Sequence, residues 1–310
     1  MFILKISHRN LYIRCFITCW QQANKTMNKE DKICVKFIND KEIKEDAYLW
    51  RYMDIHKFLS FIFKKSLYFT RLDKFEDRKE GITINHLFYQ NLKKQIDNHP
   101  MFDKVRSYMS VETLGGEMNK IDDELKKIQR SNFANCWVIG ENSSESVAMW
   151  NLYSKPNSLA IKIKYSDFKK LLIEKGLNSF DTSREVICSP INYIDFQNPD
   201  FSSFQNQDSV FTKDISFNHE NEFRIIVKEK IREIPAINYK PNIHRKNIEK
   251  LHNGMWDYFG VELKLFDFTS FDFEIIHHPK SQDWAKKNIK EIIRLSEIDF
   301  KVNESILELK

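Results

Sequence analysis

Two glutamates and an arginine alternate in the segment HENEFRIIV, residues 219–227. In an extended strand every second side chain points to the same face, so Glu220, Glu222 and Arg224 are expected on one side. Paired carboxylates suit ribosyl transfer from NAD: Glu222 would stabilise an oxocarbenium-like transition state, and Glu220 would activate the acceptor. The alternative is a solvent-facing rim in which Arg224 pairs with Glu222. The sequence leaves both interpretations open.

A second group of charged residues lies in RLDKFEDRKEG, residues 71–81. It contains Arg71, Asp73, Lys74, Glu76, Asp77 and Glu80. Acidic turns can bind a divalent cation through oxygen ligands, but their carboxylates more often accept hydrogen bonds from backbone amides. We favour the structural use, in which the carboxylates cap the next helix and accept hydrogen bonds from backbone amides. Asp77 and Glu80 are in addition expected to hold Arg51 in place. A metal-dependent nuclease built on Asp73, Asp77 and Glu80 is the alternative.

A third candidate is the segment NSSESVAMWNLY, residues 142–153. Its polar start predicts a helix cap, and Ser146, Trp150 and Tyr153 are spaced i, i+4 and i+7 on one helical face. Aromatic rings beside a hydroxyl group could stack a nicotinamide or another base. The alternative is a capped helix whose tryptophan lies in the core.

Other catalytic motifs are missing from the sequence. The five cysteines are scattered without a CxxC pair, which is typical of reduced thiols in a cytoplasmic protein. Cys136 lies in an apolar run and is expected to be a packed thiol rather than a nucleophile. The histidines have no zinc-ligand spacing, and neither a Walker loop nor a G-x-G-x-x-G motif occurs. The sequence therefore predicts no metal site.

Apolar periodicity predicts short strands mixed with helices. Strands are expected at 47–53, 66–70, 135–139, 158–164, 184–196, 221–229 and 271–279. Helices are expected at 54–65, 83–97, 117–130, 142–153, 167–175 and 281–297. Asp54 is placed to cap the first helix, while Ser166 and Gly176 should bound the helix at 167–175. This irregular order predicts one α+β domain with a central, mostly antiparallel sheet and peripheral helices.

The expected domain covers residues 47–298, between an N-terminal extension at 1–46 and a C-terminal tail at 299–310. Charged residues interrupt the apolar runs of the first twenty residues, so a signal peptide is not indicated. Met27 is an alternative start that would place residues 1–26 upstream of the protein. No stretch reaches the length of a membrane span. The net charge of +5 comes from 49 basic and 44 acidic residues, too balanced for a dedicated nucleic-acid coat.

Four sequence blocks together resemble a widespread bacterial and phage family whose domain has no assigned function. The blocks are LWRYMD…SLYFTRLDKFEDRKEG, ANCWVIGENSSESVAMWNLY, HENEFRIIV and FEIIHHPKSQDWAKKNI. They occur in the family's order over roughly residues 47–295. Arg78 replaces the proline that the family usually has in its F-x-D-P-x-E-G-like turn. Members often lie near antiviral defence genes, which implies a defence role.

A more distant likeness is to ADP-ribosyltransferases, which have a basic residue on a first strand, then a helix, a second strand and a late E-x-E motif. Arg51, SLYFT and Glu220–Glu222 follow this order. The likeness implies NAD as the substrate, with Glu222, Glu220 and Arg51 in the reaction. The implied NAD contacts are Arg51, Tyr52, Arg71, Ser146, Trp150 and Tyr153. The competing hypothesis is a non-catalytic sensor that binds a nucleic acid or a phage protein.

Overall fold

The computed structural model describes residues 32–33, 35–98, 111–140, 144–174, 177–178, 185–200, 208–228, 259–265 and 272–309. The alternative start at Met27 and the expected helix end at Gly176 lie outside these residues. Among the described cysteines, Cys136 and Cys188 are free thiols.

One large sheet organises the described part of the chain. Its twelve strands are β1 (Lys32–Ile33), β2 (Val35–Phe37), β3 (Tyr48–Met53), β4 (Ser66–Arg71), β5 (Asn132–Gly140), β6 (Leu159–Lys164), β7 (Leu177–Asn178), β8 (Glu185–Pro190), β11 (Glu222–Lys228), β12 (Gly260–Leu265), β13 (Glu274–His277) and β14 (Lys301–Asn303). Nearly all neighbours are antiparallel, with β2–β8 and β13–β14 as the parallel pairs. The short strands β9 (Asn192–Ile194) and β10 (Thr212–Asp214) form a separate parallel pair. The predicted α+β class is confirmed.

The sheet divides along strand β5. On one edge, β11 pairs with β5 over its whole length from Asn132 to Val138. On the other edge, β4 pairs with residues 133–134 and β3 pairs with residues 138–140. Residues 135–137 therefore have β11 on one side and no described strand on the other. This division separates β3 from β4 in the middle of the sheet.

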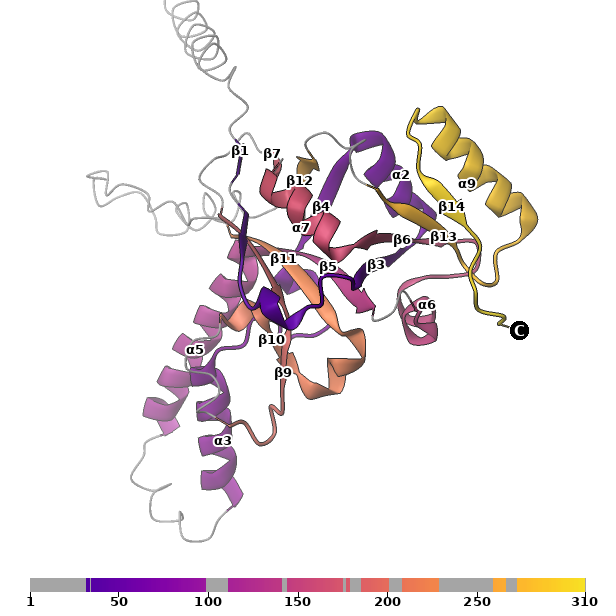
Figure 1. Ribbon diagram of the computed structural model, residues 1–310. Coiled ribbons are helices and arrows are strands. Elements are labelled where there is room, and N and C mark those ends of the chain that lie inside the picture. Colours follow the sequence, from indigo (N-terminus) through magenta and orange to yellow (C-terminus); the bar gives the residue numbers. More distant parts are fainter. Residues whose placement is uncertain are drawn as a thin grey trace, which may run out of the picture.

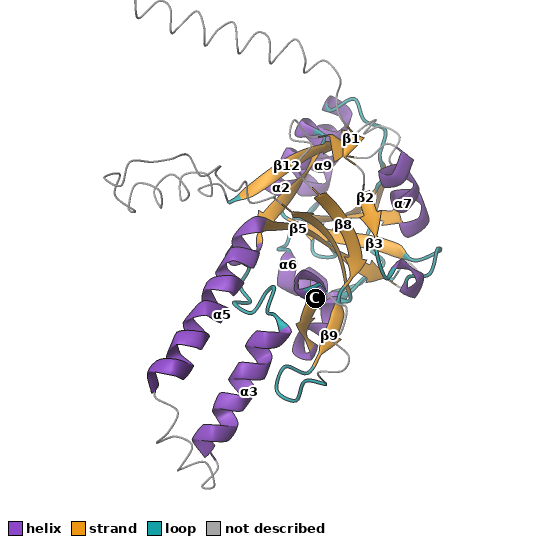
Figure 2. Cartoon of the chain, turned by 90° about the vertical axis from the view of Figure 1, so that its left-hand side faces the viewer, coloured by secondary structure: helices purple, strands orange, loops and turns teal. Residues whose placement is uncertain are grey.

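Helices lie around the sheet, as expected (Figure 1). They are α2 (Ile55–Lys64), α3 (Ile84–Asn98), α5 (Val111–Ser131), α6 (Val147–Tyr153), α7 (Tyr165–Glu174) and α9 (Asp283–Leu295). The Asp54 carboxylate caps α2 by accepting a hydrogen bond from the Lys57 amide, as predicted. The predicted cap at Ser166 is wrong, because α7 begins at Tyr165 directly after β6. Figures 1 and 2 show α3 and α5 lying side by side and projecting away from the sheet.

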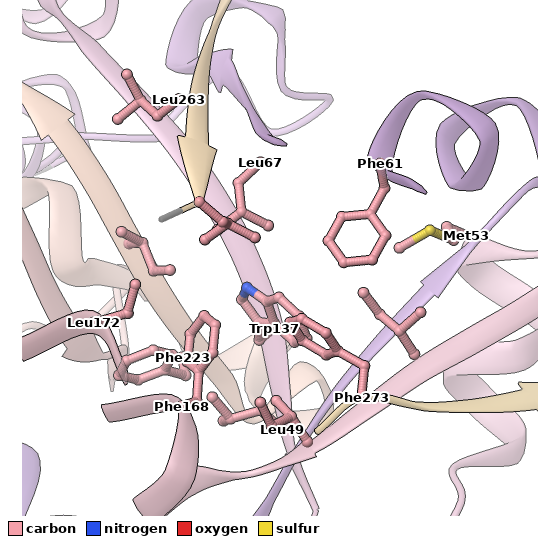
Figure 3. Packing of buried hydrophobic residues seen from close by; sticks show 14 of the residues in the cluster. Leu49, Met53, Phe61, Leu67, Trp137, Phe168, Leu172, Phe223, Leu263 and Phe273 are labelled. Carbon is pink, nitrogen blue, oxygen red and sulfur yellow. The ribbon is translucent and has the colours of Figure 1, made fainter. Parts of the chain in front are cut away.

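The main core is built around Trp137 on β5, shown in Figure 3. Its ring centre lies 5.0 Å from that of Phe168 and 6.3 Å from that of Phe273. Its indole N–H donates to the Asn135 side-chain oxygen at 2.6 Å, so the polar atom is satisfied. Each fully buried aromatic side chain of this kind contributes roughly 1.5–3 kcal/mol to folding. The core thereby fixes the position of β5, the strand at which β3 and β4 separate.

The sheet reaches beyond the domain limits expected from the sequence. Strand β2 belongs to the expected extension and pairs with β8, while β14 belongs to the expected tail and pairs with β13. Both segments are thus integral to the sheet. Among the described residues, no helix is long and apolar enough to cross a membrane.

Candidate functional site

A cavity of about 530 Å³ lies over the division of the sheet. Its walls come from β3, β4 and β5, the turn after β4, helix α6 and the segment that leads into β11. The side chains that face it include Arg51, Tyr52, Glu80, Cys136, Tyr153, Lys213, Glu220 and Glu222. The volume falls within the range of roughly 300–1,000 Å³ that is typical of small-molecule sites. The division of the sheet at β5 therefore brings charged groups from five parts of the chain together.

Arg224 lies at the base of this cluster and joins two carboxylates. Its Nε and Nη2 donate to the Glu222 oxygens at 2.6 and 2.9 Å. Its Nη1 and Nη2 donate to the Glu80 oxygens at 2.7 and 3.2 Å, and Nη1 also donates to the Val210 carbonyl at 2.9 Å. The predicted pairing of Arg224 with Glu222 is confirmed. Glu80 was expected to hold Arg51, and this expectation is wrong because Glu80 holds Arg224.

Lys213 on β10 is a second internal cation, which the sequence gave no reason to single out. Its ammonium group lies 2.5 Å from a Glu220 oxygen, 3.4 Å from Glu80 and 3.7 Å from Glu222. The second Glu220 oxygen accepts a hydrogen bond of 2.6 Å from the Tyr153 hydroxyl. Both oxygens of Glu220 therefore have a partner inside the protein.

Glu220 and Glu222 converge for a different reason from the one predicted. Glu220 ends a 3-10 helix, η6 (Ile215–Glu220), and only Glu222 belongs to strand β11. Asn221 between them has a φ of 38°, a left-handed conformation that asparagine tolerates better than most residues. The two side chains are 7% and 5% exposed. The alternative of a solvent-facing rim is thus wrong.

The charges of the cluster keep one another ionised. Burial would raise the pKa of Glu222, but the positive charges of Arg224 and Lys213 oppose burial and the pKa is lowered. Burial would likewise lower the pKa of Lys213, but Glu222 and Glu80 raise it. The same two carboxylates hold the pKa of Arg224 well above its ordinary value against the effect of burial. Three carboxylates and two cations thus form this cluster, and Arg51 adds a third cation at the cavity wall.

Cys136 on β5 lines the cavity next to Glu222. Burial raises the pKa of the thiol, and the negative charge of Glu222 adds to this effect. The neighbouring thiol in turn contributes to lowering the pKa of Glu222. Because burial keeps the thiol protonated, Cys136 is not poised to act as a nucleophile.

Arg51 on β3 faces the same cavity without a counter-ion. Within the part of the chain that the structure describes, its half-buried guanidinium has neither a hydrogen bond nor an ion pair. It lies 5.8 Å from the centre of the Trp137 ring. Burial lowers the pKa of Arg51 to about 10, so the side chain stays protonated at neutral pH. Asp77 does not hold it, because an Asp77 oxygen instead accepts a 2.9 Å hydrogen bond from the Lys79 amide.

The acidic turn divides between two roles. Asp73 accepts hydrogen bonds from Arg71 at 2.6 and 3.0 Å, and this pair lies outside the lining of the cavity. Asp77 and Glu80 face the cavity but have the backbone and ion-pair partners given above. Among the described residues, no group of three or more acidic, histidine or cysteine side chains is arranged to hold a metal ion. Asp73, Asp77 and Glu80 therefore do not form one centre.

Helix α6 contributes one of its three predicted residues to the cavity directly. Ser146 caps the helix, and its amide donates to the Tyr52 hydroxyl at 2.9 Å. Trp150 is fully buried and packs edge-to-face against Tyr52, with ring centres 4.7 Å apart. Tyr153 lines the cavity, whereas Ser146 and Trp150 do not. Both residues contact Tyr52, whose pKa burial raises to about 12.

No family model, curated protein or solved structure matches this chain. The resemblance to the bacterial and phage family and the likeness to ADP-ribosyltransferases therefore stay predictions.

Proposed function

We propose that the protein binds NAD in the cavity beside Glu222 and breaks its nicotinamide–ribose bond, as ADP-ribosyltransferases and NAD glycohydrolases do. One observation carries the proposal. The cavity combines an ionised carboxylate of fixed orientation, Glu222, with a cation, Arg51, that has no ion pair or hydrogen bond among the described residues. A ligand with a phosphate and a ribose complements both groups.

Each group has a role in this reaction. Glu222 accepts hydrogen bonds from ribose hydroxyls and stabilises the positive charge that develops on the sugar. Arg224 donates hydrogen bonds to both Glu222 oxygens, so the carboxylate needs no reorientation when the positive charge develops on the sugar. Arg51 pairs with a phosphate of the dinucleotide. Tyr52 and Tyr153 supply aromatic surface on the cavity wall.

The resemblance to a family found near antiviral genes gives this activity a setting. Loss of NAD in the cytoplasm would stop the growth of an infected cell, and a modified protein or nucleic acid would serve the same end. A non-catalytic sensor is the second candidate, because Lys213, Glu80 and Arg224 are fully engaged inside the protein.

Incubation of the purified protein with NAD tests the proposal. Nicotinamide release is followed by chromatography, and NAD binding is followed by the shift in thermal unfolding. We expect release with the parent protein and none with Glu222→Gln. Glu291→Gln is the matched control, because Glu291 also pairs with an arginine, Arg294, but on the exposed face of α9.

Three outcomes are informative. Nicotinamide release that is lost only in Glu222→Gln supports the proposal. A thermal shift with NAD but no turnover would show binding without catalysis and contradict the proposed cleavage. The absence of both turnover and a thermal shift with NAD would contradict the proposed function and leave the sensor as the remaining candidate.

A further inference from the structure

We infer that Lys213 is a built-in cation that occupies the acceptor position of the site, so that the ribosyl group passes to water and not to a guanidinium acceptor. This inference rests on the proposed function. It concerns the second half of the reaction, after nicotinamide has left. It assigns a specificity-determining role to a residue that the sequence alone did not indicate.

The first observation is that Glu220 is already engaged. The Lys213 ammonium lies 2.5 Å from one of its oxygens, and the Tyr153 hydroxyl donates to the other at 2.6 Å. A guanidinium acceptor needs a carboxylate that can take two parallel hydrogen bonds. Glu220 cannot accept two parallel hydrogen bonds from a guanidinium while Lys213 and Tyr153 occupy its two oxygens.

The second observation is that the Lys213 ammonium is enclosed by groups that attract cations. It lies within 4 Å of carboxylate oxygens of Glu80, Glu220 and Glu222. It also lies 4.5 Å from the centre of the Phe217 ring. Three carboxylates and an aromatic face are what a cationic acceptor would require. The protein fills that place with its own side chain, which is only 5% exposed.

The third observation is the charge balance of the cluster. With Lys213 in place, the three cations Lys213, Arg224 and Arg51 balance the three carboxylates Glu80, Glu220 and Glu222. A second cation entering beside Lys213 would be repelled by it at close range. Water carries no charge and needs little space, so it remains an acceptor that this arrangement admits.

The reaction with water balances without any further reactant. The bond between the ribose C1′ and the nicotinamide nitrogen breaks, and its electron pair leaves with neutral nicotinamide. A water oxygen bonds to C1′, and one proton passes to solvent. The products are ADP-ribose, nicotinamide and a proton.

The test uses agmatine, a small guanidinium compound, with Lys213→Ala. With the parent protein we expect ADP-ribose as the product, no ADP-ribosyl-agmatine and no agmatine-dependent thermal shift. With Lys213→Ala we expect agmatine to raise the unfolding temperature relative to sodium chloride of equal ionic strength. If NAD is cleaved, ADP-ribosyl-agmatine should also appear. Lys126→Ala, which removes an exposed lysine on α5, is the control and should behave as the parent.

Product analysis and thermal unfolding together separate the inference from the proposed function. Absence of NAD cleavage in the parent contradicts the proposed function, while the thermal shifts still report on the cation site. Transfer to agmatine by the parent, or a Lys213→Ala variant that ignores agmatine, overturns the inference. If Lys213→Ala does not fold alone, recovery of the folded state with agmatine but not with salt supports it. Failure to recover contradicts it.

Discussion

The guanidinium of Arg224 donates to both oxygens of Glu222, at 2.6 and 2.9 Å, in a place where Arg224 has no exposed surface. The ion pair between Arg224 and Glu222 is therefore a structural contact, and it also orients Glu222, a candidate functional carboxylate. A buried ion pair contributes little net stability, yet removing one partner is strongly destabilising because the other charge is left uncompensated. Substitutions here should change activity and stability together.

Glu222→Gln should abolish nicotinamide release and also lower the free energy of unfolding, by about 3 kcal/mol. The charge that balances Arg224 and Lys213 is lost inside the protein. An exposed carboxylate would give almost no change in stability. Urea denaturation of the variant beside Glu291→Gln measures the difference. Equal stability of the two variants would contradict the burial of the pair.

Arg224→Lys should destabilise the protein by more than Glu222→Gln. A lysine keeps the charge but lacks the fork that reaches Glu222 and Glu80 simultaneously, so two carboxylates lose hydrogen bonds. We expect a loss of at least about 3 kcal/mol, measured by urea denaturation. Arg294→Lys on the exposed face of α9 is the control and should cost less than about 1 kcal/mol. Similar losses for the two lysine variants would show that the fork is dispensable.

Buried histidines predict a loss of stability in weak acid. Burial lowers the pKa of His277, with Lys290 and Lys286 adding to the effect and Glu304 opposing it, and burial also lowers that of His86. The unfolded chain then binds protons more readily than the folded one below about pH 6.5. The free energy of unfolding should therefore fall as the pH decreases through that value.

Urea denaturation between about pH 5 and pH 8 measures this slope, which is set by the difference in bound protons. His277→Gln should reduce the slope, because His277 is fully buried and neither of its ring nitrogens has a hydrogen-bond partner among the described residues. His56→Gln, at an exposed position on α2, should leave the slope unchanged. A slope that is the same in all three proteins would refute the assignment to His277.

Two glycines should respond in opposite directions to alanine. A Cβ at Gly140 would lie 2.6 Å from the indole nitrogen of Trp50, so Gly140→Ala forces that ring to move. We expect a loss of about 1–3 kcal/mol, measured by thermal unfolding. A Cβ at Gly116 in α5 meets nothing within 4 Å, and Gly116→Ala should stabilise the protein by about 0.5–1 kcal/mol. Stabilisation by both substitutions would contradict the close approach of Trp50 to the backbone.

Local relationships were predictable from the sequence because they depend on neighbouring residues. The strand–helix–strand unit with its Asp54 cap follows from apolar spacing and one capping side chain. Glu222 and Arg224 share a face because they are two residues apart in a strand. The α+β class follows from the order of such local elements. Each of these features is fixed by a short stretch of chain.

The tertiary structure decided how the charges are used. Glu80 and Arg224 are 144 residues apart, and Lys213 reaches the cluster from a separate strand pair. Their meeting depends on the division of the sheet along β5, which no local pattern encodes. Burial, too, is a property of the assembled sheet, and it excluded the alternative of a solvent-facing rim. The sequence by itself determined which carboxylates and cations are present. Only long-range packing determined that, among the described residues, Arg51 lines the cavity without an ion pair while Arg224 holds Glu222.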